Sequence, residues 1–411
     1  MKSTVTIAIV GATATGCATA GTLASFGWQD ILVLDRRKLP GTVPFPDIDP
    51  GFVFAPLTAE DDLPLLRESH LIGRDLSFRG ETAFDRVGSL TIATTSDGMD
   101  ALTNRAAVLA AAGVEVVILT ATETAMRLPL VDPARIAGSL SVPGDGIIRP
   151  HVVRAGLIER TIEPASPVRN VDAESAVIFR GDVDVNSIQQ TDRGWRIDSS
   201  RGAVDARFVV WTGDGAPQPL NRGPIGQPPR ALYVETAPLP GLKWLADREV
   251  TLPAVHHWES GLSLRQRHSC LGILGTATVT GRNGRDQGLA LAARAAELFP
   301  ELGHASISTS SLVNALPTRG QPSVQSALAG GMNPMVDTGI ACPPVPCGLA
   351  VGLGRRIARD IAGDSAERRA ARDRDLCRLE SAPAAWMAGE GADRWASPWT
   401  ADDTGIGATL H

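Results

Sequence analysis

The chain opens with residues that could hold the phosphates of a nucleotide. Gly11 and Gly16 enclose Ala-Thr-Ala-Thr, between an apolar run at residues 5–10 and a helix-forming run at 17–26. Glycines at these two positions permit a tight turn and close packing of helix on strand, so that phosphates can meet the helix N-terminus. Thr13 stands where a further glycine normally lets the backbone approach the diphosphate, so the predicted phosphate seat is imperfect.

A carboxylate follows this loop at the separation that a nucleotide site requires. Asp35 ends a second apolar run, residues 31–34, and an acid about 20 residues after such a loop is placed to accept ribose hydroxyls. Strand, turn, helix, strand and acid together predict a dinucleotide-binding βαβ unit. The alternative is a buried unit of the same shape whose small residues serve packing alone.

Composition and charge predict a globular protein of two or three domains. The 411 residues are 43% hydrophobic and 20% charged, with a net charge of −6. This charge gives no general attraction to nucleic acid or anionic lipid, and no apolar stretch approaches the roughly 18 residues that span a membrane. The five cysteines form no CxxC pair, which predicts a reducing, cytoplasmic location without a disulfide framework or a metal site.

The spacing of apolar residues predicts alternating helices and strands. We expect helices at 61–75, 97–112, 151–162, 286–299 and 349–361. We expect strands at 87–93, 114–119 and 206–211, and two or three short strands between 177 and 197. Residues 39–56 are rich in Pro and Gly, which predicts an extended loop over a ligand rather than regular structure.

Successive blocks of the chain resemble one family of flavoproteins. These blocks are 88–95 (Gly-Ser-Leu-Thr-Ile-Ala-Thr-Thr), 129–132 (Pro-Leu-Val-Asp), 142–146 (Val-Pro-Gly-Asp-Gly), 194–198 with 207–213, 233–236, 261–265 and 348–360. Their order resembles the dimethylglycine/sarcosine dehydrogenase family, which belongs to the D-amino acid oxidase-like superfamily of FAD enzymes. The resemblance extends over residues 5–363.

The resemblance implies an α/β fold in two parts. It implies a discontinuous FAD-type Rossmann domain from residues 1–60, 140–215 and 312–363. It implies a second α/β domain from residues 61–139 and 216–311, with a mostly antiparallel sheet as one wall of a cleft. Residues 364–411 would then form a charged C-terminal tail.

The family binds FAD, and its cofactor residues map onto this chain one by one. Gly11, Thr13 and Gly16 correspond to the glycine loop, Asp35 with Arg36 to the ribose acid, and Gly41 with Thr42 to a turn beside the diphosphate. Val185 corresponds to a strand that contacts adenine, Gly213 to the loop after the third Rossmann strand, Arg319 to a flavin-side loop and Gly348 to the start of the closing helix. Residues 43–46 are Val-Pro-Phe-Pro where many members carry a histidine that bonds the flavin, so we expect non-covalent FAD.

The family chemistry implies oxidation of a small amine. Arg265 lies on the strand where the family places an arginine for the substrate carboxylate, since a guanidinium meets a carboxylate in two parallel hydrogen bonds. Arg267 shares its face at period two, and the alternative for both is an exposed pair of strand arginines. His256 and His257 are candidates for tuning the protonation of the amine, although adjacent strand residues face opposite sides.

Two alternatives remain open at this point. The departures in the glycine loop and the missing histidine also fit a silent subunit of a heteromeric dehydrogenase. The glycine loop also resembles those of some NAD(P)-binding reductases. The expected partners are a small-molecule amine and either a second dehydrogenase subunit or a further copy of the chain, with no nucleic acid and no membrane.

Overall fold

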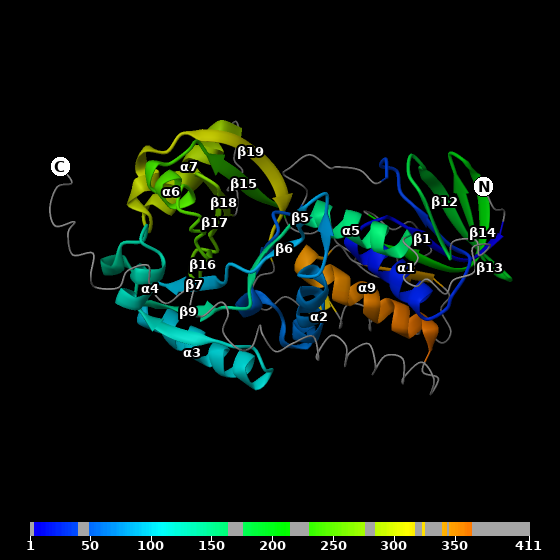
Figure 1. The fold of residues 1–411 in the computed structure, drawn as a ribbon, viewed down its shortest axis with the longest axis horizontal. Helices are drawn as coiled ribbons and strands as arrows, with labels where there is room; N and C mark the ends of the chain where they lie inside the picture. The colour runs from blue at the N-terminus through cyan, green and yellow to red at the C-terminus, as the bar shows by residue number, and fades with distance from the viewer. Residues whose placement is uncertain are drawn as a thin grey trace. The chain divides into compact units, whose positions relative to one another are not determined.

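The computed structural model describes residues 4–39, 49–162, 176–213, 230–275, 284–316, 323–324, 339–342 and 345–363. Residues Met1–Asp364 form one compact unit, and the remaining residues form a second unit that lies outside the described residues, as does the predicted tail. Two large sheets dominate the described part of the chain (Figure 1).

The first sheet carries the nucleotide-binding unit predicted from the N-terminus. Its order is β11-β2-β1-β14-β13-β12, with β20 paired to β14. The strands are β1 (Thr4–Val10), β2 (Ile31–Leu34), β11 (Val177–Arg180), β12 (Val185–Thr191), β13 (Gly194–Ser199), β14 (Gly202–Trp211) and β20 (Gly339–Ala341). β11, β2, β1, β14 and β20 pair in parallel, and β12 to β14 form an antiparallel meander. β2 is wholly apolar and buried, and β1 is apolar and buried from Ile7 to Val10, as expected where both faces of a parallel sheet are covered.

The second sheet has eight strands and is mostly antiparallel. Its order is β19-β15-β18-β17-β16-β7-β9-β8, and among its described pairings only that of β16 with β7 is parallel. The strands are β7 (Ser89–Ala93), β8 (Val117–Thr120), β9 (Gly138–Val142), β15 (Arg230–Thr236), β16 (Ala254–His257), β17 (Ser263–Arg267), β18 (Cys270–Gly275) and β19 (Ile307–Asn314). Chain segments alternate between the two sheets, so the predicted fold class is confirmed; the predicted domain boundaries stay a prediction.

Short strands and helices complete the described fold. A three-stranded sheet joins β3 (Phe52–Val53), β10 (Gly146–Ile148) and β6 (Phe84–Asp85), and β4 (Ser77–Phe78) pairs with β5 (Glu81–Thr82). The α-helices are α1 (Ala14–Ser25), α2 (Leu63–Gly73), α3 (Ser96–Ala111), α4 (Ala121–Arg127), α5 (Pro150–Ile162), α6 (Pro240–Ala246), α7 (Gly284–Ala296) and α9 (Cys347–Ala362). The 3-10 helices are η1 (Ala55–Leu57), η2 (Glu60–Asp62), η3 (Pro133–Arg135) and η4 (Pro300–His304).

Helix α9 fixes the helices around the nucleotide-binding unit. It packs closely on α1, because a Cβ at Gly354 would overlap the carbonyl oxygen of Thr15. Thr19 reinforces this crossing, since its hydroxyl donates to the Gly354 carbonyl at 3.1 Å. The small residues of α9 therefore let two helix backbones approach each other.

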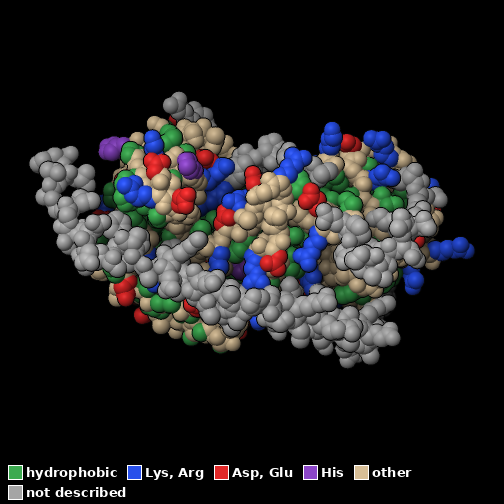
Figure 2. Space-filling model, viewed as in Figure 1, with side chains coloured by type: hydrophobic (Ala, Val, Ile, Leu, Met, Phe, Trp, Pro, Cys, Tyr) green, Lys and Arg blue, Asp and Glu red, His purple; other side chains and the backbone are tan. Residues whose placement is uncertain are grey.

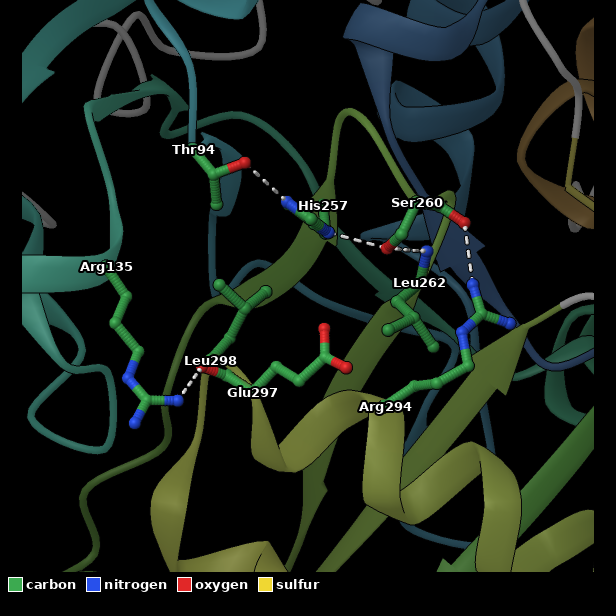
Figure 3. A pocket seen from close by; sticks show the side chains of 8 residues that line it. All are labelled: Thr94, Arg135, His257, Ser260, Leu262, Arg294, Glu297 and Leu298. Carbon is green, nitrogen blue, oxygen red and sulfur yellow. Dashed lines mark hydrogen bonds between the residues drawn. The ribbon is translucent and has the colours of Figure 1, made fainter.

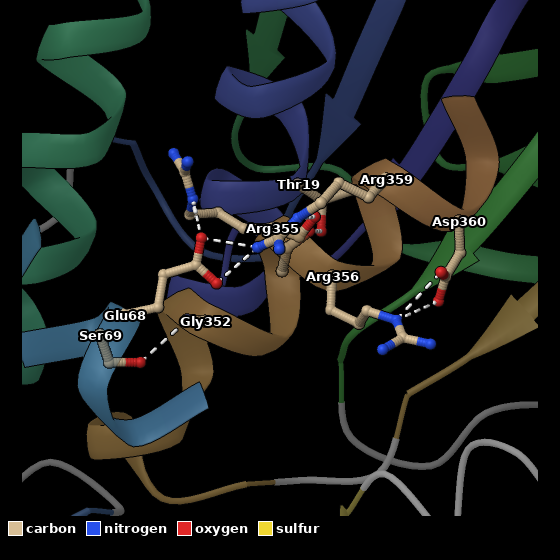
Figure 4. A network of polar contacts seen from close by, with 9 residues as sticks. Thr19, Glu68, Ser69, Gly352, Arg355, Arg356, Arg359 and Asp360 are labelled. Carbon is tan, nitrogen blue, oxygen red and sulfur yellow. Dashed lines mark hydrogen bonds and ion pairs between the residues drawn. The ribbon is translucent and has the colours of Figure 1, made fainter. Parts of the chain in front are cut away.

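A buried ion cluster joins α9 to α2 (Figure 4). The Glu68 carboxylate, 9% exposed, accepts hydrogen bonds from Arg355 Nε at 2.5 Å and from Arg359 Nη2 at 2.6 and 2.5 Å. Ser69 accepts a hydrogen bond from the Gly352 N–H at 2.9 Å. Two guanidinium groups thus hold one carboxylate at the crossing of these helices.

Most predicted elements agree with the structure to within a few residues. The helix predicted at 97–112 is α3, and the strand predicted at 206–211 is the end of β14. The prediction of no regular structure over 39–56 is wrong in its described C-terminal part, because Phe52–Val53 form β3 and η1 begins at Ala55. The short helices α4 and α6 and the strand β9 were not predicted.

Two further features of the described chain are the apolarity of its helices and the distribution of charge on one face of its surface. None of the helices in the described ranges combines the length and apolarity needed to cross a membrane. On the face drawn in Figure 2, acidic and basic side chains are interspersed.

Candidate active site

The glycine loop forms the tight turn that its sequence predicts. Gly11 has φ +107°, which favours glycine, and a Cβ there would lie 2.6 Å from the Gly213 nitrogen. A Cβ at Gly16 would overlap the Gly11 carbonyl oxygen. Thr212, at the end of β14, donates its hydroxyl to that same carbonyl at 2.7 Å. The ends of β1 and β14 therefore meet beneath the start of α1.

Thr13, the departure from the usual loop, caps the helix. Its hydroxyl accepts the Gly16 N–H at 3.2 Å and donates to Thr212 Oγ1 at 3.0 Å. Threonine is a favoured N-cap residue because its oxygen satisfies one N–H of the first helical turn. Both contacts keep the Thr13 hydroxyl within the loop.

Asp35 lies at the end of β2, and nitrogen donors surround it. Its Oδ2 accepts the Ala12 N–H at 2.7 Å and Arg37 Nη2 at 3.2 Å, while Oδ1 accepts Arg37 N at 2.8 Å and Arg37 Nε at 3.0 Å. Burial raises the pKa of Asp35, but the hydrogen bonds and charge of Arg37 outweigh it and hold the pKa below its ordinary value. Asp35 is therefore an ionised carboxylate beside the phosphate-binding loop.

A group of polar side chains shares one face of the eight-stranded sheet. Leu90, Ile92, Val255 and Leu264 belong to the hydrophobic core on the other face, so the residues that alternate with them in the strands point away from that core. We call this set the Arg265 face; it comprises Thr91, Tyr233, His256, Ser263 and Arg265. Strand pairing places Thr91 beside His256, and His256 beside Ser263.

Arg265 is buried and lies close to two aromatic rings. Only 6% of the residue is exposed, and its guanidinium carbon lies 5.7 Å from the ring centroids of both Phe52 and Tyr233. Gly272, opposite Arg265 in β18, makes room for Tyr233, since a Cβ there would overlap the phenol oxygen. Arg267, two residues on, is exposed and pairs with Glu235 at 2.9 Å. The two arginines share a face, but only Arg265 is enclosed.

His256 belongs to the Arg265 face and reaches the segment that carries the aromatic residues. Its Nδ1 lies 2.8 Å from Ser263 Oγ, and its ring centroid lies 5.6 Å from that of Phe54. Phe54 in turn stacks on Phe52 at 5.6 Å. Thr91 Oγ1, fully buried next to His256, has no hydrogen-bond partner among the described residues. This face therefore offers buried polar groups to a ligand.

His257 lies on the opposite face and lines a separate cavity of about 240 Å³ (Figure 3). Its Nδ1 lies 2.5 Å from Ser260 Oγ, and its Nε2 lies 3.0 Å from Glu259 Oε2. Burial lowers the pKa of His257, although Glu259 and Glu297 act to raise it. The two predicted catalytic histidines therefore do not share a site.

A buried carboxyl ties the aromatic segment to the second sheet. Asp145 Oδ2 accepts the Ser89 hydroxyl at 2.7 Å and the Ala55 N–H at 2.9 Å. Burial raises the pKa of Asp145 to about 7, although both hydrogen bonds act to lower it. Arg105 also holds this segment, because its guanidinium donates to the carbonyl oxygens of Ala55, Pro56 and Thr58.

Comparison with known proteins identifies the family. The family model described as FAD dependent oxidoreductase, DAO, matches residues 6–353. The chain belongs to the DAO family. The chain is thus an FAD-dependent oxidoreductase, and the predicted cofactor and enzyme class are confirmed. Because the matching family is FAD-dependent, the alternative of an NAD(P)-binding reductase is not supported.

Solved structures of low sequence identity share this DAO fold. Glycine oxidase from Geobacillus kaustophilus is 19% identical with a TM-score of 0.62, and 89% of this chain and 96% of that one are covered. Iminodiacetate oxidase from Chelativorans sp. BNC1 is 20% identical with a TM-score of 0.63, over 88% and 96%. L-proline dehydrogenase from P. horikoshii is 14% identical with a TM-score of 0.67, over 88% and 93%.

The residues around the glycine loop of this DAO-family protein fit the ADP half of FAD. The turn at Gly11 is tight enough for a diphosphate to approach the α1 N-terminus, and Asp35 is ionised at the end of β2. Gly213 lies against this turn through its N–H, which donates to the Val10 carbonyl at 3.1 Å. Arg36, beside Asp35, is exposed.

The other predicted cofactor residues are placed as follows. Val185 is the first residue of β12. The hydrogen bond to Asp35 comes instead from Val183, whose N–H donates to the Asp35 carbonyl at 3.1 Å. Gly348 lies in the first turn of α9, where an added Cβ would lie 3.2 Å from Val53. Asp49 caps this helix by accepting the Cys347 N–H. Gly41, Thr42, Arg319 and the segment 43–46 lie outside the described residues.

Arg37, Phe52, Asp145 and Thr212 are among the contributors to the site that were not predicted as site residues from the sequence. Asp145 stands in the Val-Pro-Gly-Asp-Gly block, and Thr212 immediately precedes Gly213, so their neighbours carried a signal. The position of Phe52 against Arg265 depends on contacts between residues more than 200 apart in sequence.

Proposed function

We propose that this DAO-family enzyme oxidises a small N-alkylated amino acid at the carbon beside nitrogen, as the dimethylglycine and sarcosine dehydrogenases do. FAD, when bound, supplies the electron sink. The part of the chain is to bind the substrate carboxylate, to orient the C–H bond and to keep the amine neutral. The observation that carries the proposal is the enclosed guanidinium of Arg265.

Arg265 is suited to a carboxylate because of where its guanidinium lies. A guanidinium presents several N–H donors in a fixed plane and can hold a carboxylate through two of them. The rings of Phe52 and Tyr233 restrict its orientation, and burial strengthens its interaction with an anion. We infer that the substrate carboxylate is recognised here, and that uncharged amines bind less strongly.

His256 is the candidate for handling the amine proton. It lies on the Arg265 face with one ring nitrogen held by Ser263 at 2.8 Å, which fixes the ring. Histidine exchanges a proton near neutral pH, and an amine must be neutral to lose a hydride from the adjacent carbon. His257, on the other face, has no part in this proposal.

The compounds named for three similar proteins support a carboxylate-bearing amine as substrate. Glycine, iminodiacetate and L-proline, the compounds in the names of three of them, each combine a basic nitrogen with a carboxylate. We propose further that the enzyme is cytoplasmic and acts with a second dehydrogenase subunit or with another copy of itself, as predicted from the sequence.

Arg265→Ala tests the proposal, with Arg267→Ala as the matched control. Removing one partner of a buried charge pair costs about 2–5 kcal/mol of binding, so KM for N-methylglycine should rise at least tenfold while KM for an uncharged N-methylated amine stays within about twofold. Arg267 lies on the same strand but is exposed and paired with Glu235, so its replacement should leave both KM values nearly unchanged.

Two results would refute this assignment. Equal effects of Arg265→Ala on acidic and uncharged amines would place the carboxylate elsewhere. A flavin-containing wild-type protein that is reduced by none of these amines would favour the silent-subunit alternative.

A further inference from the structure

The Asp35 carboxylate has no acceptor position left for a ribose hydroxyl. A carboxylate offers about four lone-pair positions, and Asp35 receives four N–H contacts, one from Ala12 and three from Arg37. A ribose that binds to Asp35 must therefore displace a donor.

The four donors differ in how readily they can leave. The Ala12 N–H belongs to the glycine loop, whose turn is fixed by Gly11 and Gly16. The Arg37 N–H belongs to the backbone, and the Asp182 N–H holds this backbone by donating to the Arg37 carbonyl at 3.2 Å. The Arg37 guanidinium, by contrast, belongs to a side chain that is 37% exposed, so its two contacts with Asp35 can be lost without moving the backbone.

We propose that the Arg37 guanidinium competes with the adenosine ribose for the Asp35 carboxylate. Cofactor binding then exchanges the two guanidinium contacts for ribose hydroxyl contacts. Arg37 therefore lowers the affinity for the ADP moiety and slows its association, while Asp35 keeps its charge in both states. The inference concerns the family cofactor and does not depend on the identity of the amine.

ADP binding to the flavin-free full-length protein tests this competition without any catalytic readout. By titration calorimetry, Arg37→Ala should bind ADP about tenfold more tightly than wild type, a factor that corresponds to ~1.4 kcal/mol. Lys38→Ala is the matched control, because it removes a positive charge from the exposed residue on the other side of Arg37; its ADP affinity should stay within about twofold of wild type. Arg37→Lys keeps the charge without the two-pronged contact and should give an intermediate gain.

A double substitution assigns the gain to Asp35. In an Asp35→Ala background, Arg37→Ala should give no further gain in ADP affinity, because the contested acceptor is absent. Unchanged or weaker ADP binding by Arg37→Ala, with thermal unfolding like that of wild type, would overturn the proposal. The proposal would also be overturned if the wild type preferred 2′-phosphorylated ADP to ADP and Arg37→Ala lost this preference, because Arg37 would then be a phosphate ligand.

Discussion

The wild-type protein should lose folding stability as pH rises, and Asp145→Asn should remove this loss. The pKa of Asp145 is raised by burial from 3.8 to about 7 in the folded chain. The folded protein thus keeps a proton that the unfolded chain has lost between these pH values, so folding stability falls as pH rises through this window and levels off above it. A shift of about 3 pKa units corresponds to roughly 4 kcal/mol at 1.36 kcal/mol per unit.

The asparagine variant isolates the ionisation because its amide oxygen can accept the same two hydrogen bonds, from Ser89 and Ala55. Urea unfolding of the flavin-free protein at pH 5 and pH 8 should show wild type losing roughly 3 kcal/mol relative to Asp145→Asn, by the same conversion. Ser89→Ala, which keeps the carboxyl, should retain the loss. Parallel changes in wild type and Asp145→Asn would refute a raised pKa at this position.

Three further substitutions test the helix crossing, the enclosed arginine and the loop. In calorimetric scans of thermal unfolding, Glu68→Gln should destabilise the fold by about 3–5 kcal/mol, because it removes the buried partner of two guanidiniums. Asp360→Asn is the control: its i,i+4 pair with Arg356 is more exposed, so its loss should cost under about 1 kcal/mol. Gly272→Ala should displace Tyr233 and raise KM for acidic amines. Gly303→Ala is the control, because a Cβ there meets nothing within 4 Å, and it should leave KM unchanged. Equal KM values for the two variants would show that Tyr233 does not contribute to substrate binding. Thr13→Gly should cost only a few tenths of a kcal/mol in stability and should tighten FAD binding in fluorescence titrations; weaker binding would mean that the threonine cap helps to form the phosphate seat.

Local signals allowed much of the fold to be predicted. The run that forms β2 and the second half of β1 are apolar on both faces, and the glycines between them favour a tight turn. The helix α4 was missed although Thr120 and Glu123 form a capping box, because the helix has only seven residues and shows little periodicity. Period-two alternation also predicted that His256 and His257 face opposite sides.

The remaining parts of the site depend on contacts that sequence spacing does not reveal. The burial of Arg265 requires Phe52, from a segment predicted to be irregular. Asp145 meets Ala55 and Ser89 across 90 and 56 residues of chain. The Arg37 fork on Asp35 is local, but it depends on the side-chain conformation of Arg37 rather than on residue type alone.

Anaerobic mixing of the purified flavin-containing enzyme with N-methylglycine tests directly whether the enzyme oxidises an N-alkylated amino acid. We expect the visible absorbance of oxidised flavin to be lost with a saturable dependence on amine concentration, and the loss to require higher amine concentrations in Arg265→Ala. Persistence of the oxidised flavin spectrum with N-methylglycine, N,N-dimethylglycine and glycine alike would contradict oxidation of an amine at this site.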